Sequence, residues 1–485
     1  MKTIVTKLIL SGFILLSILS CEDVLEEEPM TFISPNNFFT SFSDFEAAVK
    51  GIYGITRGMT GGWQTQLKDL FADYSDVPEF SEQTEDIWRN NPGSDFWAIR
   101  EGWSVPYQVV SNANQVLTAL EEAPLNENQK NSIAAETKFL RAYAYFNLVQ
   151  LYGDVPLRTK PVESVAETQI ERSPQAEVYE LIIRDLKDAE SGLPTTAVQE
   201  GRVNSFVAKA LLARVYLATA GSPMNITANY ALARDKALEV IAGPFELLDD
   251  FANVFKNTSY TTESIWEILY LEGISSNGKH NQTAPTGNQT AMLLPSDDFI
   301  NSFPAGDRRR EWGIKDKFTT SGGVDFVART YYNKFIDESK LEQELPPSAT
   351  ETDFSFPLIR LAEMYLIAAE AENEANGPDN AYPYINQVRW RARIDKNDPS
   401  HVPDLSGLSK EQFREAVWNE RKWELFTEEH AWFDLKRTDS FDKVQTARGN
   451  QLIVPIGDYN STWILPDFEL LNNNIPDNPP YGGSG

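Results

Sequence analysis

The stretch from Asn126 to Tyr152 constrains the fold more than any other, because its apolar residues cover most of a helical circumference. Asn126 with Gln129 three residues later predicts a capping box at the helix start, and Gly153 predicts the helix end. A helix that is apolar on most sides must be surrounded by other elements. The residues on its two apolar faces are Phe139, Ala142, Tyr143, Phe146 and Val149, and Leu140, Ala144, Leu148 and Leu151.

The same pattern returns along the chain as pairs of helices. Ser173 and Pro174 predict the start of a partner helix that ends near Gly192. Further pairs are predicted in 201–243 and in 356–394, each alanine-rich and separated by short Gly, Pro or Asn turns. These pairs look like degenerate tetratricopeptide units, since strict 34-residue spacing is absent. A last long helix is predicted from Ser409, with a capping box to Gln412, through to Arg437.

Two regions break this pattern. Residues 243–353 contain a polar, loop-like stretch and a short alternating run, Trp266 to Tyr270, that predicts a strand. Residues 60–105 also look loop-rich and contain four tryptophans. The expected fold class is therefore mainly α, with degenerate tetratricopeptide-like helix pairs plus an irregular, loop-rich face with short strands.

The N-terminus has the layout of a secretory signal. Lys2 and Lys7 precede an uncharged, mostly apolar run that is too short for a membrane span. Residues 1–20 are expected to be removed as a signal peptide. Cys21, the only cysteine, follows a sequence similar to a bacterial lipobox and is the expected lipid anchor to a membrane. Residues 21–35 then form an acidic tether.

Composition excludes some functions. The formal net charge of −28 makes nucleic acid an unfavourable partner, because phosphate binding depends on clustered Lys and Arg. One cysteine excludes a disulfide framework. Length alone favours about three domains.

Seven segments in order resemble the SusD/RagB family of Bacteroidetes outer-membrane lipoproteins. The resemblance covers nearly the whole mature chain. The sequence departs from the family pattern in two places. Glu429 and Ala431 stand where the family commonly has Gly and Arg, and the closing segment "NNNIPDNPPY" is looser than usual. The segments are "FFTSFSDFEAAVKGIYG", "ETKFLRAYAYFNLVQLYGDVPL", "GRVNSFVAKALLARVYLATAG", "FPLIRLAEMYLIAAEAENE", "INQVRWRAR", "ERKWELFTEEHAWFDLKR" and "ILPDFELLNNN".

The resemblance implies one domain over 36–485, with tetratricopeptide-like helices mainly at 126–243 and 356–437. It also implies a non-catalytic surface receptor that captures glycans, or in some members peptides. Such a receptor closes like a lid over a TonB-dependent outer-membrane barrel, which is the expected protein partner. The resemblance overrides the domain number that length alone favours.

An enzyme remains an alternative at this stage. The sequence contains only three histidines, His280, His401 and His430. A His-based catalytic triad or a metal site with several histidine ligands is therefore disfavoured. His430 is expected to be packed and His280 solvated. No cofactor or metal site is predicted, and the loop at Asp395 lacks the Gly and Glu of a calcium loop. A secreted glycoside hydrolase needs only two carboxylates, which spacing cannot reveal, and a tetratricopeptide scaffold for other proteins is the third possibility.

A glycan receptor would use aromatic side chains, because the C–H face of a sugar can lie on an indole while polar groups bond its hydroxyls. Tryptophans in predicted helices are expected in the core, namely Trp390, Trp418, Trp423 and Trp432. Those in the loop-rich regions are the candidates for ligand binding. The predicted ligand-binding residues are Trp63, Trp88, Trp97, Trp312, Asp73, Asn91 and Arg308. Arg308 begins a run of three arginines that could instead be salt-bridged.

Overall fold

In the computed structural model of the chain, the described residues are 38–61, 67–77, 82–271, 273–275, 277–283, 285, 292–320, 322–341, 352–473 and 475–478. The predicted signal, Cys21 and the acidic tether lie outside these ranges. Within the ranges, no helix combines the length and the apolar character that crossing a bilayer requires.

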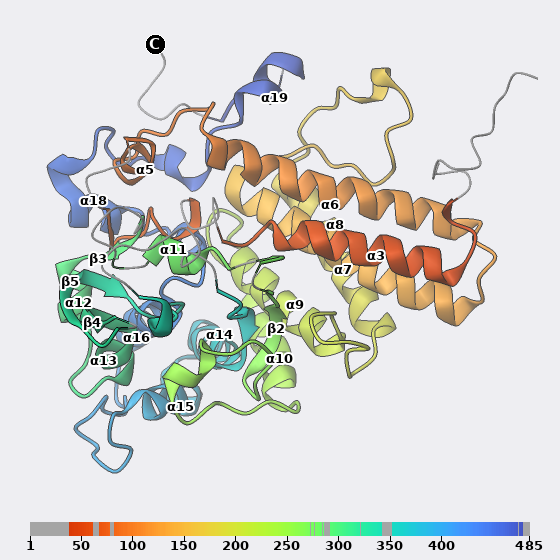
Figure 1. Ribbon diagram of the computed structural model, residues 1–485. Helices are drawn as coiled ribbons and strands as arrows, with labels where there is room; N and C mark the ends of the chain where they lie inside the picture. The colour runs from red at the N-terminus through yellow and green to blue at the C-terminus, as the bar shows by residue number, and fades with distance from the viewer. Residues whose placement is uncertain are drawn as a thin grey trace, which may run out of the picture.

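Long helices packed side by side form one part of the molecule (Figure 1). Consecutive helices contact one another from α6 to α10, and α10 then contacts α14, which packs on α15 and α16. Stacked helix pairs produce this arrangement. The helices are α3 (Phe42–Arg57), α6 (Trp97–Glu121), α7 (Glu127–Tyr152), α8 (Gln175–Gly192), α9 (Ser205–Ala220), α10 (Asn229–Ile241), α14 (Leu361–Asn376), α15 (Tyr382–Ala392) and α16 (Lys410–Leu425).

The predicted helix pairs are confirmed as α7 with α8, α9 with α10, and α14 with α15. Asn126 caps α7, since its side chain accepts from the Gln129 backbone N–H at 3.0 Å. Ser409 caps α16 in the same way through Gln412. The start of α8 differs from the prediction by one residue, because Pro174 is its N-cap and Gln175 the first helical residue.

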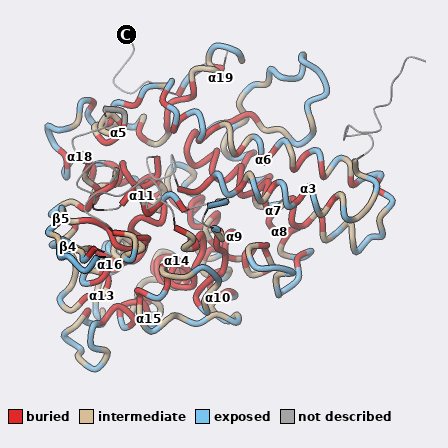
Figure 2. Tube along the Cα trace, viewed as in Figure 1, coloured by how far each residue is buried: buried red, intermediate tan, exposed pale blue. Residues whose placement is uncertain are grey.

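The core runs through the centre of the helix array, where buried residues predominate in Figure 2. Every residue of α7 from Phe139 to Tyr152 is buried, as its apolar circumference predicts. α9 is similar, with thirteen of its sixteen residues buried. The outer helix α8 keeps one buried stripe and an exposed face.

Short strands and helices form the irregular part. Figure 1 shows β3, β4 and β5 grouped with α12 and α13 at the left of the view, whereas α3, α6 and α7 extend to the right. Three antiparallel two-stranded sheets occur among the described residues. They pair β1 (Ser75–Asp76) with β3 (Leu294–Pro295), β2 (Ser264–Ile268) with β6 (Phe356–Arg360), and β4 (Ile314–Thr319) with β5 (Asp325–Tyr332).

Short helices cover the rest of this part. They are α5 (Glu82–Trp88), α11 (Lys279–Thr283), α12 (Asp297–Ser302), α13 (Arg308–Gly313), α17 (Ala431–Arg437), α18 (Asp442–Arg448) and α19 (Asp467–Asn472). The predicted strand near Trp266 is confirmed as β2, and all five of its residues are buried.

Three expectations about elements are wrong. The region 60–105 is not simply loop, because α5 and the start of the 25-residue helix α6 lie in it. Residues 356–360 form strand β6 rather than the beginning of a helix, because they pair with β2. The helix predicted from Ser409 to Arg437 is broken between α16 and α17, where Thr427 and Glu429 adopt φ of 61° and 65°.

Candidate functional site

A hollow of about 430 Å³ opens beside the C-terminal end of α5, and we call it the Trp88 hollow. Residues from β1, the β3–α12 junction, β5 and α18 line it. Two of its walls are held together by backbone pairing, since Ser75 lies opposite Pro295 and Asp76 opposite Leu294. Its charged lining residues are Asp73, Asp76, Asp297, Asp298, Arg329 and Arg448.

Trp88 is the aromatic residue of this hollow. Its Nε1 donates to the carbonyl oxygen of Ser75 at 2.9 Å, which ties α5 to β1. The Cζ of Arg448 lies 4.8 Å from the centroid of the indole ring, as in a cation–π contact. Only 7% of Trp88 is exposed, so the indole is held in a fixed orientation. It differs from the equally buried Trp312 in that it lines a hollow.

Arg448 supports Trp88 and the chain that precedes β1. Its guanidinium is buried and donates to the carbonyl oxygens of Leu70 at 2.9 Å, Ala72 at 2.6 Å and Trp88. Burial lowers the pKa of Arg448 to about 9. The carboxylate of Asp73 acts in the other direction and raises this pKa, because it stabilises the charged guanidinium. This one side chain therefore fixes two backbone segments at the hollow, 70–72 and the end of α5.

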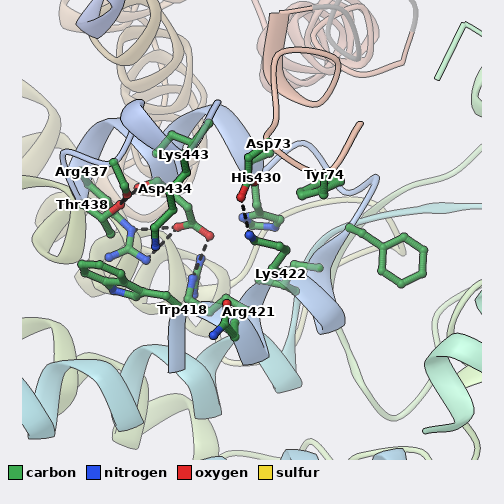
Figure 3. Close-up of a pocket in the computed structure, with 16 residues that line it drawn as sticks. Asp73, Tyr74, Trp418, Arg421, Lys422, His430, Asp434, Arg437, Thr438 and Lys443 are labelled. Atoms are coloured by element: carbon green, nitrogen blue, oxygen red, sulfur yellow. Dashed lines mark hydrogen bonds and ion pairs between the residues drawn. The ribbon is translucent and has the colours of Figure 1, made fainter. Parts of the chain in front are cut away.

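Asp73 lies at the border between the Trp88 hollow and a smaller cavity of about 50 Å³, which Figure 3 shows. The Nζ of Lys422 donates to Asp73 Oδ2 at 2.5 Å, drawn there as a dashed line. The Asp73 side chain is 13% exposed. It is held by Lys422 while remaining in the wall of the larger hollow.

The remaining charges differ in exposure. Asp297 and Asp298 are exposed in the first turn of α12, whose N-cap Ser296 accepts from the Phe299 backbone N–H. Arg329 is exposed on β5 and forms no ion pair with the residues that the structure describes. The hollow thus combines an aromatic surface with exposed acceptors and one exposed guanidinium donor.

This combination suits a ligand with an apolar face and a rim of hydroxyl groups, because carboxylates accept from hydroxyls and a guanidinium donates to them. In the described part of the chain, no group of three or more His, Cys, Asp or Glu side chains is placed to hold a metal ion.

The structure brings together two of the seven predicted ligand-binding residues, Trp88 and Asp73, in the Trp88 hollow. Trp97 is 40% exposed at the start of α6, where its ring meets Phe96 edge to face. Asn91 is exposed shortly after α5. Trp63 lies outside the described residues.

Trp312 does not lie in a loop as predicted. It is on α13, only 7% exposed, and its ring stacks on Phe255 at 6.1 Å and meets Phe251 edge to face. Nζ of Lys256 lies 5.2 Å from the centroid of the same ring. Core packing therefore accounts for Trp312.

Arg308 is salt-bridged. Of the two roles that the sequence allowed, ligand binding and ion pairing, the structure favours ion pairing. Its guanidinium donates to Asp250 at 3.1 Å and to Glu311 at 2.7 Å. The neighbouring Arg309 is fully buried against Asp307, Glu420 and Glu424. Both arginines therefore form ion pairs within the fold and do not form an anion-binding clamp.

Two expectations about single residues are confirmed and two are wrong. His430 is a packed histidine, and its pKa is held well below its ordinary value by burial and by Arg214. Trp432 is fully buried. By contrast His280 is buried on α11, where its Nδ1 accepts from the Asp337 backbone N–H at 3.1 Å. Trp390 is 38% exposed, although it is on a helix.

Sequence reasoning missed Asp76, Asp297, Asp298, Arg329 and Arg448 as neighbours of Trp88. Ser296 followed by two aspartates is a readable helix start. No local signal places that helix start or Arg448 beside Trp88, since these residues are 208 to 360 positions away in the chain.

Family models match two parts of the sequence. The model described as "SusD family" matches residues 327–460, and one described as "Starch-binding associating with outer membrane" matches residues 26–217. SusD-like protein P2 of Formosa agariphila is 30% identical over 509 residues, covering 96% of this chain and 98% of the relative. SusD-like protein P25 of the same organism is 29% identical, covering 89% and 90%.

Solved structures share the fold. A SusD superfamily protein from Parabacteroides distasonis superposes with a TM-score of 0.81 at 24% identity, covering 91% of this chain and 100% of that chain. A laminarin-binding SusD-like protein superposes with a TM-score of 0.76 at 24% identity, with the same coverage.

Proposed function

Because this chain belongs to the SusD/RagB family, we propose that it is a non-catalytic, cell-surface receptor that captures an oligosaccharide or polysaccharide in the Trp88 hollow. The description of one matching family model, starch-binding and associated with the outer membrane, supports both the ligand class and the location. The neighbour that binds laminarin supports a glycan ligand in the same way.

The observation that carries the proposal is the placement of Trp88 and Asp73 in one hollow with an exposed arginine. Trp88 is held by Ser75 and Arg448, and Asp73 by Lys422, so both are preorganised before a ligand arrives. Preorganised groups lose little conformational entropy on binding. A hollow of about 430 Å³ lies within the roughly 300–1,000 Å³ typical of small-molecule sites.

Two further parts of the proposal come from the sequence. Cys21 is acylated and holds the receptor on the outer membrane, and the receptor delivers its glycan to a TonB-dependent barrel. A single acyl chain gives only marginal attachment, whereas two or more give a stable anchor. Cys21→Ala is therefore expected to release the protein from the membrane fraction, and pull-down from solubilised outer membrane should recover a large barrel protein.

An affinity gel screen tests capture. Soluble starch, laminarin, xylan and alginate are embedded in native gels, and the receptor should be retarded by at least one of them. The same polysaccharides are then incubated with the protein, and their chain length should not change. Shortening would favour a glycoside hydrolase, and retardation by none of them would contradict a glycan receptor and favour a peptide ligand.

The site is tested by calorimetry on Trp88→Ala with the polysaccharide that retards the receptor most. Loss of an aromatic contact is expected to weaken binding about tenfold or more, by analogy with bases stacked on aromatic side chains. Trp390→Ala is the matched control, because Trp390 is exposed on α15 and does not line the hollow. A thermal melt separates a loss of affinity from a loss of folding.

A further inference from the structure

A second hollow, of about 650 Å³, runs along β4, and we call it the β4 hollow. All six residues of β4, from Ile314 to Thr319, line it. Arg310 and Glu311 of α13 form another wall, and Asp325, Tyr331 and Glu338 complete it. Its volume also lies within the range of small-molecule sites.

The β4 hollow has an aromatic floor. Phe318 stacks on Phe326 of the neighbouring strand, with centroids 5.8 Å apart and planes inclined by 18°. Tyr331 is buried, and its hydroxyl donates to the Lys317 carbonyl oxygen at 3.3 Å. The half-exposed Phe318 is the aromatic surface that a ligand in this hollow can contact.

Polar groups surround this floor. The Nζ of Lys315 donates to Glu338 at 2.7 Å, which orients both side chains at the wall. Asp316 and Lys317 are exposed, and the ammonium of Lys317 forms no ion pair with the described residues. A fixed aromatic surface with donors and acceptors at its rim is the arrangement already found around Trp88.

Strand β5 joins the two hollows. Arg329 and Thr330 line the Trp88 hollow, and the next residue, Tyr331, lines the β4 hollow. Arg329 and Tyr331 are two positions apart on one strand, so their Cα atoms are separated by about 7 Å. The two hollows therefore flank the same stretch of β5.

We infer that the β4 hollow is a second subsite for the same glycan, so that the receptor prefers polymers over short oligosaccharides. This inference rests on the proposed function, since it assigns a second part of the ligand to a receptor already engaged at Trp88. Its physical consequence is a dependence of affinity on chain length, because only a long oligosaccharide fills both hollows.

The test is calorimetry with di-, tetra- and hexasaccharides prepared from starch, laminarin, xylan and alginate. Affinity should rise about tenfold or more between the shortest and the longest ligand of the series that binds. Phe318→Ala and Lys317→Ala should remove most of this gain and leave disaccharide affinity unchanged. Lys187→Ala, at an exposed position on α8, is the matched control for Lys317→Ala.

Hydrogen exchange on the unaltered protein gives an answer that does not depend on how the variants fold. The hexasaccharide should slow exchange in β1 and in β4, whereas the disaccharide should slow it in β1 alone. Protection of β1 without β4 by the hexasaccharide, or affinity that does not change with length, would overturn the second subsite and leave the receptor function intact. If none of the glycans binds, both the function and the subsite are contradicted.

Discussion

Arg448 and Arg329 both line the Trp88 hollow, but one is buried and the other exposed, so replacing them separates stability from binding. Arg448→Met removes one donor from each of the carbonyl oxygens of Leu70, Ala72 and Trp88. Leu70 and Ala72 still accept from the Ser75 hydroxyl, so the loss falls mainly on the Trp88 carbonyl oxygen. An unsatisfied buried group costs about 1–3 kcal/mol, so the variant should lose about that much unfolding free energy. Urea unfolding measures this loss.

Arg329→Ala should behave in the opposite way. Since Arg329 is exposed and unpaired among the described residues, its loss should change the unfolding free energy by less than about 0.5 kcal/mol. Glycan affinity should fall about tenfold or more, because one hydrogen bond to a charged donor contributes roughly 1.5–3 kcal/mol. An Arg329→Ala variant with full affinity would remove this residue from the site.

Glu267 on β2 makes stability depend on pH. Burial raises the pKa of Glu267 to about 7 from 4.5, even though Ser264 and Ser355 donate to its carboxylate. Between these two values the folded protein binds a proton that the unfolded chain does not, so stability falls as pH rises through this window. The effect amounts to about 3 kcal/mol.

Glu267→Gln is neutral at every pH and should lack this dependence. Urea unfolding of both proteins from pH 4.5 to pH 8 measures the difference. The variant should gain stability relative to the parent protein as pH rises. A difference that stays constant across the window would contradict the shifted pKa of Glu267.

At the scale of elements, the break between α16 and α17 depends on Glu429. This residue adopts φ of 65°, a conformation that the Gly implied by the family resemblance adopts without strain. Its carboxylate lies 3.4 Å from Nζ of Lys68 and 3.2 Å from Nζ of Lys279, and it accepts from the Gly61 backbone N–H at 3.0 Å. All three partners are buried. The negative charge of Glu429 compensates two buried ammonium groups, and this outweighs the backbone strain at position 429.

Glu429→Gly should therefore destabilise the protein, although it relieves the backbone. Removing one partner of a buried ion pair costs about 3–5 kcal/mol, whereas the strain relieved is about 1–2 kcal/mol. The denaturation midpoint should fall, and Glu429→Gln should lower it too, because the strain remains and the charge is lost. A Gly variant as stable as the parent would show that the buried charges do not depend on Glu429.

Elements with caps and continuous periodicity could be predicted from sequence, and others could not. Asn126 and Ser409 predict the starts of α7 and α16, because their side chains bond to backbone groups only three residues away. α6 escaped prediction, since Pro106 inside it is normally a breaker. The break at Thr427 and Glu429 carries no Gly or Pro, and long-range contacts fix its backbone.

The candidate site was only partly predictable for the same reason. Trp88 and Asp73 could be chosen because each lies in a segment of weak periodicity. Trp312 was chosen on the same argument, but Phe251 and Phe255 bury it. Burial by residues distant in sequence has no local signature, so loop-like context alone could not separate Trp88 from Trp312.

At the scale of the whole molecule, a buried ionic network joins the helix array to the strands. Glu424 of α16 accepts from Arg360 of β6 at 2.6 Å, from Arg309 of α13 at 3.1 Å and from Arg391 of α15. Burial alone would raise the pKa of Glu424, but the three guanidinium groups hold it well below its ordinary value. Its contribution to stability is therefore lost as pH falls below about 4.5.

Glu424→Gln should destabilise the fold by about 3–5 kcal/mol, because it leaves the buried guanidinium groups short of negative charge. Glu415→Gln on the same helix is the control, since Glu415 is 56% exposed and, among the described residues, forms an ion pair with Lys443 alone, at 3.3 Å. Urea unfolding should separate the two. Equal midpoints would mean that the network does not hold the two parts together.

A crystal structure of the complex shows whether the Trp88 hollow binds the glycan. The ligand is the hexasaccharide with the highest affinity in the calorimetric series. We expect sugar rings in contact with Trp88 and within hydrogen-bonding distance of Asp73 or Arg329, extending over β5 toward Phe318. An oligosaccharide bound elsewhere on the protein, with none of it in the Trp88 hollow, would show that this hollow is not the glycan site.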